Sequence, residues 1–175
     1  MKSSENRTNQ ITSLLAIAIS VVAMLVSILE VSAVREQQRA DVWPYVELGQ
    51  SYSESGFRLQ AINKGVGPAL VGEVTLYRGD KLVETIDQLI LDTVGPENAF
   101  GYELYGAANI SNSVMAPGEE NDLFRVPWED RTRLLIQRWQ QGDPIDIRLC
   151  YCSIHNDCWN TSLLQQQPEP TDQCT

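Results

Sequence analysis

The chain has 175 residues, of which 43% are hydrophobic and 21% are charged, and its formal net charge is −10. Lys2 and Arg7 are balanced by Glu5 and Glu30, so the whole negative charge belongs to residues 35–175. A domain of this charge repels nucleic acid and anionic lipid headgroups. The composition therefore excludes a nucleic-acid-binding role, and the length is sufficient for one domain with its own core.

The first feature along the chain is an apolar run from Ile11 to Leu29, which contains no charged residue, Gly or Pro. As a helix rising about 1.5 Å per residue it measures roughly 28 Å, close to the thickness of a bilayer's hydrocarbon core. The sequence therefore predicts a transmembrane helix at residues 11–34, with the lipid bilayer as its partner. The polar residues 1–10 before it are expected to form an unstructured cytoplasmic tail.

A cleaved signal peptide is the alternative interpretation of this segment. Lys2 and Arg7 would form its basic region, and the small residues at 31–33 resemble a cleavage site. The apolar run is longer than a typical signal-peptide core of about 7–15 residues. This length favours an uncleaved anchor.

The orientation of the anchor is indicated by the cysteines. Basic residues flank the apolar run equally on both sides, so their distribution does not define which side is cytoplasmic. All four cysteines follow the run: Cys150, Cys152, Cys158 and Cys174. An even number at close spacing is typical of disulfides in an oxidising compartment. We therefore expect an inner-membrane or plasma-membrane protein with a cytoplasmic N-terminus and a periplasmic or extracellular C-terminal domain.

The rest of the chain predicts mainly β structure. Residues 35–43 are expected to form a helical stalk or linker that ends at Pro44, because the residue before a proline avoids the helical conformation. Residues 44–165 then alternate short apolar stretches with Gly- and Pro-containing turns, a pattern typical of a β-sandwich. The predicted strands are residues 45–48, 57–62, 71–77, 82–83, 122–127, 145–152 and 158–164.

Three segments interrupt or follow these strands. Residues 84–91 are ambiguous between strand and helix, and residues 92–112 are expected to form a long loop. Residues 128–141 predict a short helix, because apolar residues recur at helical spacing and Gly142 follows directly. The polar residues 166–175 are expected to form a flexible tail.

Three motifs carry a resemblance to a known family: NKGVGPA at residues 63–69, RGDK at 78–81 and APGE at 116–119. Their order between strands resembles bacterial CARDB-type immunoglobulin-like domains over roughly residues 57–126. The resemblance implies an immunoglobulin-like β-sandwich, and the sequence departs from the family pattern at residues 84–114 and 128–141. Together with the predicted membrane helix, the expected fold is mainly β: an N-terminal transmembrane helix followed by an immunoglobulin-like β-sandwich with short helical insertions. The combination of VWPYVEL, NKGVGPA and CYCS…CW also resembles an uncharacterised bacterial family of single-pass membrane proteins, which implies no named activity.

The cysteine cluster is the candidate functional site. Cys150 and Cys152 lie two residues apart on a predicted strand, so they project from the same face. One interpretation is a cross-strand disulfide between Cys152 and Cys158, with Cys150 either free or bonded to Cys174. The alternative is a copper(I) or zinc site, because paired thiolates bind soft metals. Its ligands would be Cys150, Cys152 and Cys158, with His155 completing the set.

The Cys-Tyr-Cys motif is similar to the Cys-aromatic-Cys motif of copper-delivery factors in cytochrome oxidase assembly, whose immunoglobulin-like domain is also membrane-anchored. Motifs for hydrolytic or phosphate chemistry are missing: the sequence has no G-x-S-x-G, no H-E-x-x-H and no phosphate-binding glycine loop. We therefore expect a non-catalytic interaction or accessory domain without a cofactor and with a protein partner in the envelope. A copper(I)- or zinc-handling protein is the alternative.

Overall fold

The computed structural model describes residues 2–98, 110–142 and 144–174, with side chains from Thr12 onward. The chain divides into two compact units, one ending at Asp41 and the other beginning at Val42. Helices and strands contribute comparable shares of the described residues. The chain as a whole is therefore mixed in secondary structure, because one helix at the N-terminus contributes most of the helical residues. The β structure expected after that helix is present as antiparallel sheets.

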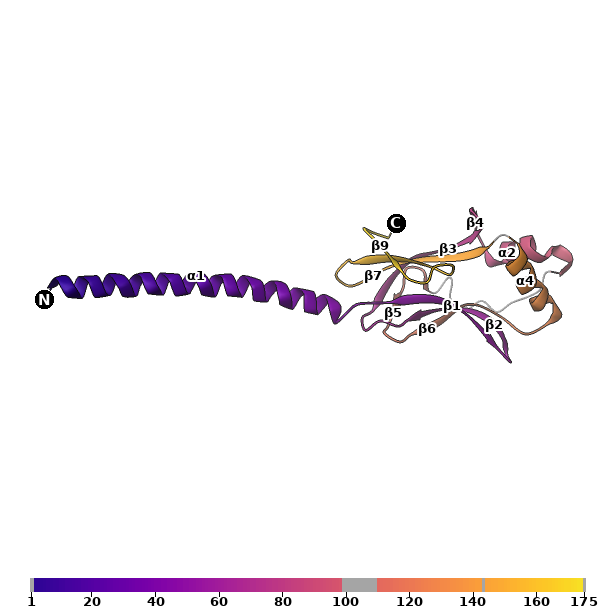
Figure 1. Ribbon diagram of the computed structural model, residues 1–175. Coiled ribbons are helices and arrows are strands. Elements are labelled where there is room, and N and C mark those ends of the chain that lie inside the picture. Colours follow the sequence, from indigo (N-terminus) through magenta and orange to yellow (C-terminus); the bar gives the residue numbers. More distant parts are fainter. Residues whose placement is uncertain (1, 99–109, 143, 175) are drawn as a thin grey trace. The chain divides into compact units, whose positions relative to one another are not determined.

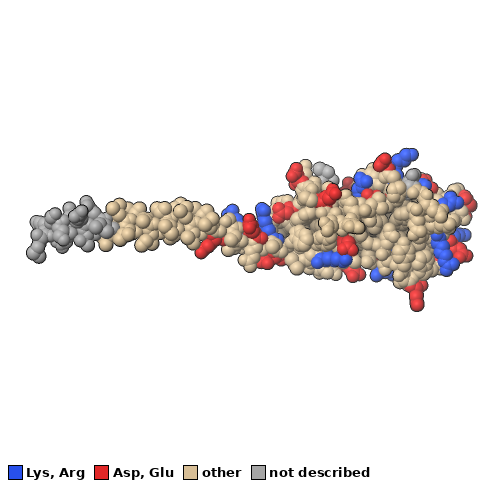
Figure 2. All heavy atoms as spheres, in the orientation of Figure 1, with Lys and Arg blue, Asp and Glu red and all other residues tan. Residues whose placement is uncertain are grey.

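Helix α1 spans Lys2–Ala40. From Thr12 onward it is long and apolar enough to cross a membrane, and Figure 2 shows no charged atoms along most of this stretch. The hydroxyl of Ser20 donates a hydrogen bond to the carbonyl oxygen of Ala16 at 2.8 Å, so this polar group is satisfied within the helix. The expected stalk is helical as far as Ala40. The expectation of an unstructured segment at residues 1–10 is wrong, because the helix begins at Lys2 and extending an existing helix costs little.

From Val42 onward, the described residues form two antiparallel sheets (Figure 1). The smaller has the order β1-β2-β6, with β1 at Val46–Ser53, β2 at Gly56–Asn63 and β6 at Glu120–Val126. The larger has the order β4-β3-β7-β8-β9, and β5 pairs with β3. The bounds of these strands are Ala69–Arg78 for β3, Lys81–Val83 for β4, Val114–Met115 for β5, Ile145–Cys152 for β7, Cys158–Ser162 for β8 and Glu169–Thr171 for β9.

One hydrophobic cluster joins the two sheets. Alternate residues of β7 are buried in it, as period-two patterning requires: Ile145, Ile147, Leu149 and Tyr151. Phe57 and Leu59 of β2 and Phe124 of β6 enter the same cluster from the smaller sheet. The sheets therefore present their apolar faces to a shared core.

Two helices cover one end of this core (Figure 1). Helix α2 at Ile86–Val94 begins where the Thr85 hydroxyl accepts a hydrogen bond from the backbone N–H of Gln88, and the short helix η1 at Pro96–Asn98 follows. Helix α4 at Asp130–Gln141 contacts α2. The helix predicted at 128–141 is confirmed, and the ambiguous segment at 84–91 is helical. The predicted loop at 92–112 includes residues 99–109, which lie outside the described part of the chain.

The C-terminal residues belong to the domain. Strand β9 pairs with β8 through Cys158 and Thr171, and Cys174 is bonded to Cys150. The predicted tail at 166–175 and the domain limit at residue 165 are therefore wrong. Only three residues form β9, and one is proline, so their sequence pattern gives no strand signal.

Candidate functional site

The side chain of Asn63 is the centre of a buried hydrogen-bond network. It is fully buried at the end of β2. Its Oδ1 atom accepts from the backbone N–H groups of Tyr45 at 3.2 Å and Gly65 at 3.1 Å. Its Nδ2 atom donates to the carbonyl oxygens of Gly67 at 2.9 Å and Met115 at 3.1 Å. One amide thus connects the segment before β1, the loop after β2 and strand β5.

The two glycines of the NKGVGPA motif allow the chain to pass close to residues 42–45. A Cβ atom on Gly65 would lie 2.4 Å from the carbonyl oxygen of Trp43, and one on Gly67 would lie 1.8 Å from that of Val42. The backbone N–H groups of Val66 and Gly67 donate to the Trp43 carbonyl oxygen at 3.0 and 3.2 Å. The motif at residues 63–69 therefore binds the segment at residues 42–45, and we call it the docking loop.

The APGE turn closes the network from the other side. Gly118 has a φ of 75°, and its N–H donates to the Asn63 carbonyl oxygen at 2.8 Å. The carboxylate of Glu119 accepts from the Asn121 side chain at 2.9 Å and from the Ala116 N–H at 2.7 Å. These two hydrogen bonds, that of Asn121 first, lower the pKa of Glu119. The ionised carboxylate therefore stabilises the turn.

Three aromatic rings connect the segment at residues 42–45 to the cysteine strands. Trp43 meets Trp159 of β8 edge-on, with ring centroids 6.5 Å apart, and Trp159 stacks on Tyr151 of β7 at 5.7 Å. Burial raises the pKa of Tyr151 to about 12. The motifs VWPY, NKGVGPA and CYC…CW, which are distant in sequence, therefore meet at one end of the domain. We call this the motif end.

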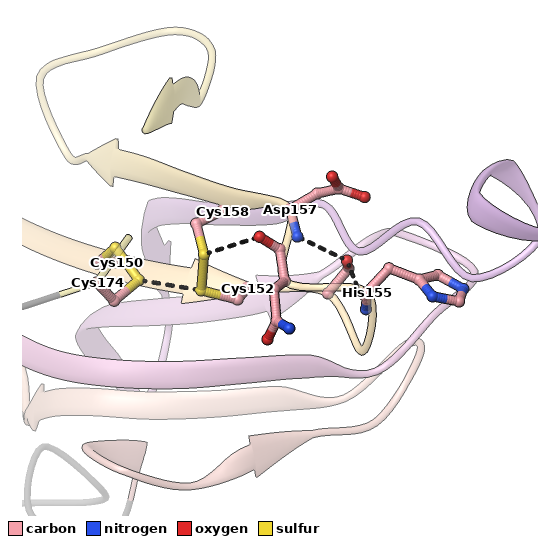
Figure 3. Close-up of a disulfide and its surroundings, with 8 residues drawn as sticks. Cys150, Cys152, His155, Asp157, Cys158 and Cys174 are labelled. Atoms are coloured by element: carbon pink, nitrogen blue, oxygen red, sulfur yellow. Dashed lines mark hydrogen bonds between the residues drawn. A yellow bond between two sulfur atoms is a disulfide. The ribbon is translucent and has the colours of Figure 1, made fainter. Parts of the chain in front are cut away.

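The four cysteines form two disulfides at the motif end (Figure 3). Cys150 is bonded to Cys174, with Cα atoms 5.5 Å apart, and Cys152 is bonded to Cys158, with Cα atoms 4.0 Å apart. Cys152 and Cys158 are direct partners in the β7–β8 register, so their bond closes the hairpin. Of the pairings left open by the sequence, the structure has Cys150 bonded to Cys174.

The two disulfides touch each other. Sγ of Cys152 lies 3.5 Å from Sγ of Cys174. The sulfurs of Cys152, Cys158 and Cys174 all lie within 4.8 Å of one another. Gly72 of β3 leaves room for this arrangement, because a Cβ atom there would lie 3.3 Å from the Cβ of Cys174. Nothing in the sequence pattern predicts the contact, since Cys174 reaches it only through β9.

The metal site proposed from sequence has a different composition in the structure. Cys152 and Cys158 meet Cys174, whereas the exposed His155 lies in the β7–β8 turn with its ring directed away from the sulfurs (Figure 3). Cys150 contributes through its bond to Cys174. A disulfide sulfur carries no thiolate, so metal coordination by these residues requires prior reduction.

The face of β7 that carries Cys150 and Cys152 also carries a polar cluster, which no sequence pattern predicted. Asp146 is only 3% exposed. Its carboxylate accepts from the Ser162 hydroxyl at 2.6 Å and from Nε of Arg148 at 2.7 Å. The Arg148 guanidinium lies 4.2 Å from the centre of the Tyr77 ring, and the hydrogen bond to Asp146 raises the pKa of Arg148. The cluster connects β3, β7 and β8 and is satisfied internally.

Comparisons with protein-family models, curated proteins and solved structures find no match to this chain.

Proposed function

We propose that this protein is a single-pass membrane protein whose C-terminal domain lies in the periplasm or outside the cell and acts as a non-catalytic interaction or accessory module. Helix α1 supplies the membrane anchor, and the N-terminus is cytoplasmic. The proposed partner is a protein of the same envelope. No cofactor is needed for this role.

The observation that carries the proposal is the pairing of all four cysteines in the domain that follows the helix. Disulfides persist in oxidising compartments and are rare in the cytoplasm. A non-catalytic role is supported by the single histidine of the sequence, His155, which is exposed in a turn. The polar groups of Asn63 and Asp146 bind other groups of the domain, so their chemistry is structural.

We also assign the domain to the immunoglobulin-like β-sandwiches of the CARDB type. Two antiparallel sheets that share one core support this assignment. The turns at NKGVGPA and APGE also support it, because the backbone N–H groups of Gly65 and Gly118 both donate to Asn63. Helices α2 and α4 are insertions in this assignment, because they lie at residues 84–114 and 128–141, where the sequence departs from the family pattern.

Protease treatment of spheroplasts that contain the full chain tests the orientation. The domain is expected to be digested in intact spheroplasts, while a cytoplasmic marker remains whole. Protection of the domain until the spheroplasts are lysed would contradict the proposed orientation.

Crosslinking in intact membranes tests the interaction role. An amine-reactive reagent can reach the exposed Lys64, in the loop after β2, and the exposed Lys81, at the start of β4. We expect an adduct with a defined envelope protein. A Lys64→Arg, Lys81→Arg variant retains the charges and is expected to lose the adduct. A wild-type protein that yields no protein adduct would contradict the interaction role.

The copper(I)- or zinc-handling alternative is favoured by one observation, the three sulfurs within 4.8 Å of one another. Elemental analysis of the full chain, isolated without reductant and with thiols counted in the same sample, separates the two functions. Bound copper or zinc together with free thiols would replace the interaction role by metal handling. Oxidised cysteines without metal would eliminate the alternative.

A further inference from the structure

We propose that the two disulfides form a thiol–disulfide exchange site that accepts an electron pair from a dithiol reductant. Opening of the Cys150–Cys174 bond leaves the Cys174 thiolate beside Cys152, and this thiolate then attacks the Cys152–Cys158 bond. The protein thereby passes the reducing equivalents from one disulfide to the other. This activity goes beyond the proposed interaction role and does not depend on it.

The contact between the disulfides carries this inference. Neither sulfur of the 3.5 Å pair, Cys152 and Cys174, bears a hydrogen in the disulfide state, so the contact is a direct approach of two sulfur atoms (Figure 3). A thiolate attacks a disulfide at one of its sulfur atoms, so it must first lie beside that atom. Cys174 already lies beside the sulfur it would attack.

The exposure of the cysteines gives the exchange a direction. Cys150 and Cys174 are both partly exposed, so an external thiol can attack their bond at either sulfur. The other bond has one partly exposed sulfur, that of Cys152, because Cys158 is only 6% exposed. An external reductant therefore has more access to the Cys150–Cys174 bond, and the buried Cys158 is the last sulfur to become a thiol.

The first step is reduction of the Cys150–Cys174 disulfide by a dithiol. One thiolate of the reductant attacks Sγ of Cys150, forming a mixed disulfide and releasing Cys174 as a thiolate. The second thiol of the reductant then attacks the mixed disulfide and releases Cys150. The reductant leaves as its own disulfide, and Cys150 takes up a proton to become a thiol.

The second step is internal. The bond between Sγ of Cys174 and Sγ of Cys152 forms, and the bond between Cys152 and Cys158 breaks. The Cys158 thiolate takes a proton from water. The carbonyl oxygen of Asn156 lies 3.6 Å from Sγ of Cys158, so the new thiol has a hydrogen-bond acceptor beside it. The product carries one disulfide, Cys152–Cys174, and thiols at Cys150 and Cys158.

A matched pair of single variants of the full chain in detergent tests the proposal. Cys150→Ser leaves Cys174 as a thiol beside Cys152, whereas Cys174→Ser leaves Cys150 as the thiol. Each variant is incubated at pH 8 with N-ethylmaleimide, and its disulfides and alkylated cysteines are mapped by peptide mass spectrometry. C150S is expected to contain a Cys152–Cys174 bond and alkylated Cys158. C174S is expected to keep Cys152–Cys158 and to be alkylated at Cys150 alone.

Two results would overturn the proposal: alkylation of C150S only at Cys174 with Cys152–Cys158 intact, or release of Cys158 in both variants. A second measurement uses the wild-type chain, so that it does not depend on the folding of a variant. After reduction with one equivalent of dithiothreitol, the two-electron-reduced protein is expected to be alkylated at Cys150 and Cys158. Alkylation at Cys150 and Cys174, or at Cys152 and Cys158, would contradict the exchange.

Discussion

The two ends of the domain are stabilised by different kinds of interaction. The motif end is held by directional hydrogen bonds to Asn63 and by two disulfides. At the opposite end, which we call the helix end, α2 and α4 cover the core with apolar side chains such as Leu89, Leu135 and Trp139. Directional contacts require particular residues, whereas apolar packing requires only suitable volume. The motif end should therefore tolerate substitution less well than the helix end.

The largest expected effect is at the motif end. Asn63→Ala removes the partner of several buried backbone groups, and each unsatisfied group costs about 1 kcal/mol or more, so we expect a loss of about 4 kcal/mol of unfolding free energy. Asn160→Ala, at an exposed position of β8, is the control and should change stability by less than about 0.5 kcal/mol. Urea unfolding measures both. Similar unfolding free energies for the two variants would contradict the claim that the Asn63 hydrogen bonds stabilise the motif end.

Removal of the disulfide between Cys150 and Cys174 should have the next largest effect on stability. The bond closes a loop with a sequence separation of 24 residues, whereas Cys152–Cys158 spans 6. In the chain-entropy treatment the longer loop contributes about 3.5 kcal/mol and the shorter about 2.4 kcal/mol. The double Cys-to-Ser variants should differ accordingly in thermal unfolding. If loss of the shorter loop destabilised the domain more, the contribution of β9 to the fold would be smaller than we infer.

The helix end should show a cavity effect. Leu135 is 2% exposed, so Leu135→Ala should cost about 3 kcal/mol. Leu135→Met keeps nearly the same volume and should cost less than about 1.5 kcal/mol, which is the tolerance expected of apolar packing. Gln137→Ala, on the exposed side of α4, is the control. A methionine variant as unstable as the alanine variant would contradict the difference between the two ends.

The pH dependence of stability tests the motif end separately, because Tyr151 lies there. Burial raises the pKa of Tyr151 to about 12 from its ordinary value of 10.0, so the folded protein favours the neutral phenol. The free energy of unfolding is therefore unaffected by this group below pH 10. It falls by about 2 to 3 kcal/mol as the pH rises from about 10 to about 12, because the phenol ionises first in the unfolded chain. Tyr151→Phe should remove this part of the alkaline loss in rapid urea unfolding. An unchanged pH profile in the variant would contradict it.

Local patterns predicted the elements that depend on their own sequence. The alternation in residues 145–152 predicted β7, and helical spacing predicted α4. The same-face projection of Cys150 and Cys152, and the closeness of Cys158, followed from strand geometry. These features need no information about distant parts of the chain.

Long-range contacts could not be predicted in the same way. NKGVGPA predicted a turn, but its sequence does not reveal that Asn63 binds Met115, which lies 52 residues away. Strand β9 forms because β8 offers an unpaired edge, and the tail sequence alone does not show this. The approach of Cys174 to Cys152 depends on β9 and on the space left by Gly72. Tertiary structure, and not local propensity, determines the composition of the site.

The most direct test of the proposal that the disulfide-stabilised domain is exported is the thiol count of the full chain as it is made in cells. The cells are quenched with N-ethylmaleimide before lysis, and the intact mass is measured with and without subsequent reduction and alkylation. The account predicts no alkylated cysteine before reduction and four after it. Four alkylated cysteines before reduction would place the domain in a reducing compartment and contradict the account.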